Sequence, residues 1–108
     1  MIEFTDSNFQ KEVLQCDLPV LVVFAADWSG LCHIMDPILE KLDMSNKGNI
    51  RIGKLDAERY GTVASTYGVD KYPTIILFGT GKIIWRYSGL ISLEILTSQL
   101  KSILNKGL

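Results

Sequence analysis

A serine and a cysteine, Ser29 and Cys32, are separated by two residues in the segment Ser-Gly-Leu-Cys. Two thiols at this spacing can exchange disulfides, because one thiolate attacks and the second thiol resolves the mixed disulfide. A hydroxyl cannot form that intermediate, and it attacks other substrates at neutral pH only beside a base. His33 is the one histidine of the chain, and no acid is evidently placed to orient it toward Ser29. We therefore expect Ser29 to cap a helix with its hydroxyl rather than to act as a hydrolase nucleophile.

The sequence predicts a strand before this segment and a helix after it. Residues 19–26 are apolar without alternation, which is typical of a buried strand. Apolar residues recur at helical spacing from about residue 31 to about residue 44, with a kink expected near Pro37. Cys32 lies on the apolar side of this helix, one turn after Ser29. A helix N-terminus offers unpaired N–H groups and a partial positive charge, which together stabilise a thiolate.

The rest of the chain alternates further strands and helices. Strands are predicted at 2–4, 50–55, 74–78 and 83–87, the last two joined by a turn over 79–82. The other predicted helices are one capped by Asp6 or Ser7, one that Gly68 ends, and a last one capped by Ser92. This order predicts an α/β domain whose central sheet is covered by helices on both faces.

Length and composition limit the class of protein. The 108 residues fit a single domain. The net charge of −1 does not show the excess of basic residues that is typical of nucleic-acid-binding proteins. No apolar run approaches the roughly 20 residues of a membrane span, and the first residues show no signal-peptide pattern. Two cysteines do not make a disulfide framework. We expect a cytoplasmic monomer.

Three spaced features resemble the thioredoxin family, which carries Trp-Cys-Gly-Pro-Cys between a strand and a helix with an interior proline. Residues 28–32 read Trp-Ser-Gly-Leu-Cys, and Pro37 follows. Tyr72-Pro73-Thr74 stands where the family has its cis-proline, and Gly89 matches the glycine after the last strand. The resemblance covers essentially the whole chain. It implies a single domain over residues 1–108 with the thioredoxin fold, a central mixed five-stranded sheet flanked by four helices.

The departures from the family pattern concern its chemistry. Ser29 replaces the nucleophilic cysteine, Leu31 replaces the motif proline, and Val23 replaces a buried acid. Cys32 matches the resolving cysteine, which in the family is the more buried and less reactive thiol. Lys54 matches a lysine near that acid, so we expect it to lack a partner and to be a solvated charge at a strand end.

The resemblance implies a role among thiol–disulfide oxidoreductases, in protein disulfide reduction, electron transport and cell redox homeostasis. With Ser29 at the nucleophile position, the chain itself is expected to be inactive or nearly so, as a substituted or a naturally diverged form. Two alternatives stay open. One is a binding module without enzymatic activity, and the other is a monothiol acting through Cys32.

The family's binding groove is also implied by residue matches. The positions are Trp28, Gly30, Leu31, Tyr72, Pro73 and Gly89, and the expected partners are protein or peptide clients and a thioredoxin reductase. The groove would take an extended segment through backbone hydrogen bonds. The alternative is that Trp28 and Tyr72 only cover the core.

Neither a cofactor nor a metal is expected. Cys32, His33 and Asp36 are too few for a closed zinc site, and their side chains diverge on a helix. In the family fold, Cys16 and Cys32 belong to helices on opposite faces of the sheet. A bridge between them would exceed the roughly 7 Å that a disulfide spans between Cα atoms.

Overall fold

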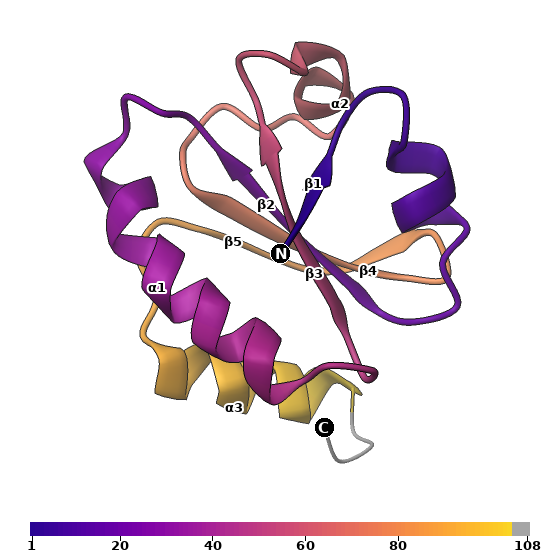
Figure 1. Ribbon diagram of the computed structural model, residues 1–108, viewed down its shortest axis with the longest axis vertical. Helices are drawn as coiled ribbons and strands as arrows, with labels where there is room; N and C mark the ends of the chain where they lie inside the picture. The colour runs from indigo at the N-terminus through magenta and orange to yellow at the C-terminus, as the bar shows by residue number, and fades with distance from the viewer. Residues whose placement is uncertain (105–108) are drawn as a thin grey trace.

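The computed structural model describes residues 1–104 and shows one mixed sheet between two layers of helices (Figure 1). The strands are β1 (Ile2–Phe4), β2 (Val20–Ala25), β3 (Arg51–Asp56), β4 (Thr74–Gly79) and β5 (Lys82–Ser88). The helices are the π-helical turn η1 (Gln10–Leu14) and the α-helices α1 (Gly30–Ser45), α2 (Gly61–Thr66) and α3 (Leu93–Leu104). The five strands and four helices confirm the predicted fold class.

The strand order is β1-β3-β2-β4-β5, which places β2 at the centre. β3 runs parallel to both β1 and β2, whereas β4 is antiparallel to β2 and β5. All six residues of β2 are buried, as the unbroken apolar run predicted. α1 therefore begins just beyond the carboxyl end of the most protected strand, and a rigid element positions the segment 28–32.

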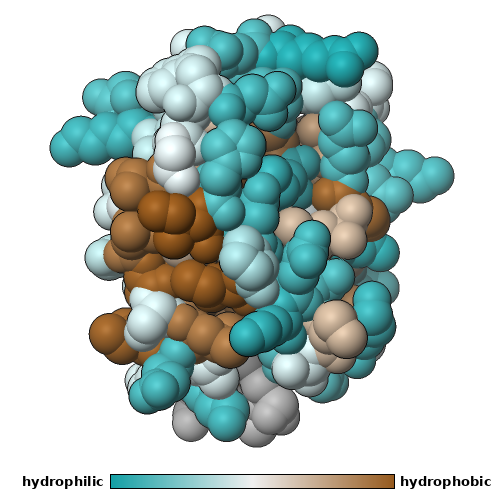
Figure 2. All heavy atoms as spheres, turned by 60° about the vertical axis from the view of Figure 1, so that its left-hand side comes forward, coloured by the Kyte–Doolittle hydropathy of each residue, from teal (hydrophilic) through white to brown (hydrophobic). Residues whose placement is uncertain are grey.

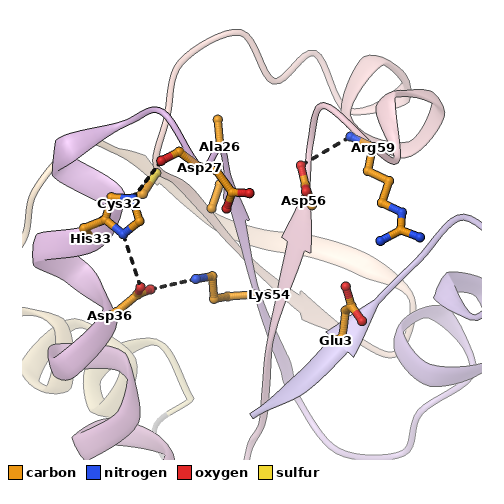
Figure 3. Close-up of a pocket in the computed structure, with 10 residues that line it drawn as sticks. Glu3, Ala26, Asp27, Cys32, His33, Asp36, Lys54, Asp56 and Arg59 are labelled. Carbon is orange, nitrogen blue, oxygen red and sulfur yellow. Dashed lines mark hydrogen bonds and ion pairs between the residues drawn. The ribbon is translucent and has the colours of Figure 1, made fainter.

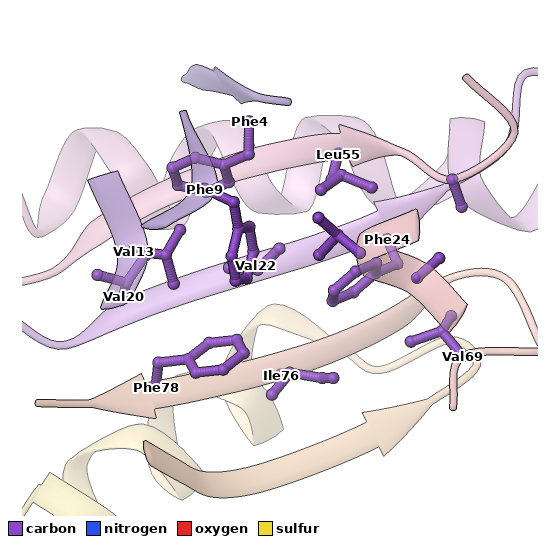
Figure 4. Packing of buried hydrophobic residues seen from close by; sticks show 13 residues of the cluster. Phe4, Phe9, Val13, Val20, Val22, Phe24, Leu55, Val69, Ile76 and Phe78 are labelled. Atoms are coloured by element: carbon purple, nitrogen blue, oxygen red, sulfur yellow. The ribbon is translucent and has the colours of Figure 1, made fainter. Parts of the chain in front are cut away.

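Alternate residues of β2 pack into two separate hydrophobic cores, one on each face of the sheet. Val22 and Phe24 face the layer of η1 and α2, and Leu21 and Val23 face the layer of α1 and α3. In the first core Phe9 packs edge-on against Phe78 with ring centroids 5.6 Å apart (Figure 4). Each large side chain buried in this way contributes about 1.5–3 kcal/mol, so the sheet is held from both sides.

The first helix begins differently from the prediction. No side chain caps η1 itself. In the turn before it, the Thr5 N–H donates to Asn8 Oδ1 at 2.7 Å and the Asn8 N–H donates to Thr5 Oγ1 at 3.1 Å. The caps predicted at Asp6 and Ser7 are therefore wrong. Asp6 Oδ1 instead accepts the backbone N–H of Val63 at 3.3 Å, a contact between segments far apart in the sequence.

The other helix ends follow their local sequence signals. Ser92 Oγ accepts the N–H of Ile95 at 3.2 Å, which confirms the predicted cap of α3. α2 ends at Thr66, and Gly68 follows with a φ of +65°, a conformation that glycine adopts without steric cost. α1 buries Cys32 on its inner side, as predicted, and Pro37 lies inside this helix; the kink expected there stays a prediction. In the part of the chain that the structure describes, no helix has the length and apolarity to cross a bilayer.

Candidate functional site

Ser29 caps α1 with its side chain. Its backbone is extended, with φ −87° and ψ 116°, and its Oγ accepts the N–H of Cys32 at 3.3 Å. The exposed fractions of Ser29 and Cys32 are 6% and 4%. The predicted helix cap is thus confirmed, and this hydroxyl satisfies a backbone donor at the position where the family pattern has its attacking thiol.

His33 is directed away from Ser29. One ring nitrogen, Nε2, lies 2.7 Å from the carbonyl oxygen of Asp27, and the other, Nδ1, lies 4.0 Å from Asp36 Oδ2. Both nitrogens thus face groups other than the Ser29 hydroxyl (Figure 3). A hydrolytic serine needs a base in contact with its oxygen, and this arrangement supplies none.

Lys54 is paired, which corrects the expectation of a solvated charge at a strand end. It lies in the middle of β3, and its Nζ is 2.8 Å from Asp36 Oδ1 on α1. The sequence reasoning missed Asp36 because that residue stands on a helix rather than on the neighbouring strand. Helical spacing did place Asp36 opposite the buried face of α1, but spacing alone did not show that Lys54 reaches it.

Val23 occupies the position of the family's buried acid without any polar replacement. It is 1% exposed and packs in the core beneath α1 and α3. Its register partners are Lys54 on β3 and Ile75 on β4. No carboxylate can therefore accept or supply a proton at this position.

Two aromatic residues from different segments meet beside the start of α1. Trp28 is 67% exposed, and its ring lies edge-on to that of Tyr72, with centroids 5.8 Å apart and an interplanar angle of 82°. The Tyr72–Pro73 peptide bond is cis. The Gly89 N–H donates to the Pro73 carbonyl at 2.8 Å. The φ of Gly89 is +106°, a backbone conformation that residues other than glycine rarely adopt. Trp28, Tyr72, Pro73 and Gly89 therefore come together in space.

These observations agree with comparisons against known proteins. The family model described as Thioredoxin matches residues 1–102. The chain belongs to the thioredoxin family. It is 42% identical over 78 residues to the thioredoxin of Rickettsia felis, covering 72% of this chain and 74% of that protein. It is 33% identical to Thioredoxin 1 of a Nostoc species, covering 92% of each chain, and 33% identical to the thioredoxin of Porphyra purpurea, covering 96% and 94%.

In this thioredoxin-family domain, polar side chains form hydrogen bonds with the backbone of the loop that leads from α2 to Pro73, here called the proline loop (residues 67–73). The buried Thr74 hydroxyl donates to the Lys71 carbonyl at 2.6 Å and lies 2.9 Å from Ser88 Oγ. Arg86 of β5 donates to the Tyr67 and Gly68 carbonyls at the end of α2. Sequence reasoning did not assign these roles, although a threonine after proline at the start of an apolar strand was a usable signal.

One tyrosine at the end of α2, Tyr67, has a shifted pKa. Burial raises the pKa of Tyr67, since an apolar environment disfavours the charged phenolate. The ring packs edge-on against Phe78, with centroids 5.2 Å apart. The neutral ring packs against the hydrophobic core on this face of the sheet.

Apolar side chains are exposed on the helical side of the molecule. Figure 2 shows apolar residues gathered over the side of the molecule where α1 and α3 lie. The large apolar side chains exposed on α1, on α3 and on the segment before α3 are Leu31, Ile34, Met44, Leu90 and Ile95. Leu31, which stands where the family pattern has its motif proline, is 42% exposed and adds one apolar side chain to this surface.

The cysteines and acids of residues 1–104 do not assemble a metal site. Within this range, no group of three or more histidine, cysteine or acidic side chains is placed to hold a metal ion. Cys16 and Cys32 are both free thiols. The site therefore combines one buried thiol, a capping hydroxyl and an aromatic pair, Trp28 and Tyr72, beside a cis-proline.

Proposed function

We propose that this thioredoxin-family chain recognises extended protein segments in its groove without exchanging disulfides. The observation that carries the proposal is the hydrogen bond from the Cys32 N–H to the Ser29 hydroxyl. This bond supports the proposal because the oxygen caps α1 where the family pattern has its attacking sulfur, and Trp28, Tyr72 and Gly89 match the family's groove positions. Family membership supports the coarser role, that of a thioredoxin-type protein with protein substrates.

The groove offers both backbone and side-chain contacts. In the described residues, the N–H and carbonyl of Tyr72 form no intramolecular hydrogen bond, so they can pair with an added extended segment. Trp28 supplies a large exposed ring next to that backbone. Aromatic rings of this kind often dominate binding free energies.

A second candidate function is monothiol chemistry through Cys32. A thiolate is the reactive form, and it needs access to its substrate as well as a stabilising environment. The α1 N-terminus supplies part of that environment, but Cys32 is only 4% exposed. We therefore place this alternative second.

Cellular setting and partners are part of the same proposal. We expect the protein to act as a cytoplasmic monomer on protein or peptide clients, and to contact a thioredoxin reductase through the same groove. The low net charge of −1 supports short-range recognition of extended segments rather than recognition of polyanions.

The test is binding to an array of short unstructured peptides, with and without cysteine. The proposal expects a subset of both kinds to bind, and expects Trp28→Ala to lose that binding. Retention of cysteine-containing peptides alone, abolished by Cys32→Ser and reversed by a reductant, would establish the monothiol instead. Absence of binding to all peptides would refute the proposed groove function.

A further inference from the structure

Three side chains link the backbone next to Trp28 with the central sheet (Figure 3). His33 Nε2 lies 2.7 Å from the Asp27 carbonyl oxygen, and His33 Nδ1 lies 4.0 Å from Asp36 Oδ2. Asp36 is in turn held by Lys54, whose Nζ is 2.8 Å from Oδ1. The links run from the loop after β2, across the first turns of α1, to β3.

The short contact decides which nitrogen of His33 carries a proton. A carbonyl oxygen only accepts hydrogen bonds, so Nε2 is the donor to Asp27. In the neutral imidazole, Nδ1 is then an unprotonated nitrogen facing a carboxylate, and no hydrogen bond joins them. Protonation places an N–H and a positive charge at Nδ1, opposite Asp36. Lys54 does not block this contact because it uses the other carboxylate oxygen.

The Asp27 carbonyl belongs to the peptide unit that joins Asp27 to Trp28. The Trp28 side chain is 67% exposed and has an edge-on contact with Tyr72. Its position therefore depends strongly on its own backbone. The N–H of Ser29, which donates to the Ala26 carbonyl at 3.0 Å, restrains the other side of this turn.

We infer that His33 is a positioning residue for Trp28, and that Asp36 strengthens this hold when the imidazole is protonated. Imidazole side chains change charge between pH 5 and 8, so His33 should restrain the Asp27–Trp28 peptide unit more strongly at the acidic end of that range. The consequence for partner binding rests on the proposed function of the groove. The consequence for the mobility of Trp28 does not.

Other charged groups modulate the effect without replacing Asp36. The pocket of about 330 Å³ that His33 lines also holds the carboxylates Glu3, Asp27 and Asp56, the Arg59 guanidinium and the Cys32 thiol. The charged groups that face His33 from neighbouring elements are therefore these carboxylates, Lys54, Arg59 and the positive end of α1. The His33 side chain is 63% exposed, so solvent screens these charges.

The test measures the Trp28 indole directly. Its ¹⁵N–¹H resonance, assigned by its loss in Trp28→Phe, is followed by relaxation measurements between pH 5 and 8. The wild-type indole should be more ordered at the acidic end. His33→Gln should lose the pH dependence, because the amide can still donate to Asp27 but does not titrate. Asp36→Asn should flatten the profile while His33 remains in place.

Glu40→Gln is the matched control, since it removes one exposed carboxylate from the same helix and should keep the wild-type profile. A profile that is flat in the wild type, or unchanged in both His33→Gln and Asp36→Asn, would overturn the inference. Thermal unfolding of each variant shows that the fold is retained.

Peptide affinity separates this inference from the proposed function. Wild type should bind a groove peptide roughly two- to tenfold more tightly at the acidic end, the range expected for one hydrogen bond. If no peptide binds while Trp28 still follows the charge of His33, the groove function fails and the positioning role stands. If peptides bind equally at every pH and Trp28 order is constant, the positioning role fails and the groove function stands.

Discussion

The Ser29 hydroxyl oxygen accepts the backbone N–H of Cys32 at 3.3 Å, across the first turn of α1. This contact joins the two positions at which dithiol members of the family carry their cysteines. It satisfies one of the backbone donors that a helix N-terminus leaves unpaired. The remaining thiol has neither a partner thiol beside it nor an acid beneath it, because Val23 occupies that position.

The first prediction concerns disulfide reduction. The chain should fail to reduce insulin with a thiol donor or a cognate reductase, since no mixed disulfide can form at Ser29. Ser29→Cys should restore part of the activity, with Cys32 resolving the intermediate, and Ser29→Ala should stay inactive. The measurement is the rate of insulin precipitation. Turnover by the unaltered chain at the rate of a dithiol thioredoxin would contradict this mechanism.

The second prediction concerns the stability that the cap supplies. Ser29→Ala should lower the free energy of unfolding by about 0.5–2 kcal/mol, because the Cys32 N–H loses its acceptor. Urea denaturation gives the value. Ser45→Ala, at the exposed end of the same helix, serves as the control and should change it by less than about 0.5 kcal/mol. Equal effects of the two changes would show that the Ser29 bond adds no stability.

The third prediction concerns the groove. Trp28→Ala should weaken binding of a groove peptide by about 1–3 kcal/mol, as loss of an aromatic anchor does. The fold should be unaffected, because the ring is 67% exposed. Cys32→Ser should leave the affinity nearly constant, since that side chain is buried. Calorimetric titration supplies the affinities.

The control for Trp28→Ala is Met44→Ala, which removes a 73% exposed apolar side chain near the other end of α1. It should bind as the wild type does. Loss of binding in Cys32→Ser with Trp28→Ala unaffected would reverse the assignment and indicate a working monothiol.

The fourth prediction concerns the missing buried acid. Val23→Asp should destabilise the domain by about 2–5 kcal/mol at pH 7, because Lys54 is already engaged by Asp36 and the position is 1% exposed. Burial raises the pKa of such a carboxyl, so its neutral form is favoured in the folded state. The loss should therefore shrink as the pH falls toward 4.

Val23→Asn is the matched change of similar shape, and its destabilisation should vary little with pH. Chemical denaturation at the two pH values measures both variants. If Val23→Asp were as stable as Val23→Asn at neutral pH, Lys54 would have to leave Asp36 and pair with the new carboxylate.

The sequence by itself determined the elements and the missing chemistry. Periodicity and capping residues act over a few positions, so the buried strand β2, the inner face of α1 and the caps at Ser29 and Ser92 were all predictable. The exchange of a sulfur for an oxygen at Ser29 was visible from the resemblance to the family pattern, because that comparison needs only residue types and their spacing.

Only the tertiary structure decided which side chains meet across the fold. The pairing of Lys54 with Asp36 and the contact of Asp6 with Val63 join segments 18 and 57 positions apart. The position of His33 against Asp27 likewise depends on how the loop after β2 enters α1. Side-chain directions and loop paths follow from the packing of whole elements, which local sequence patterns do not encode.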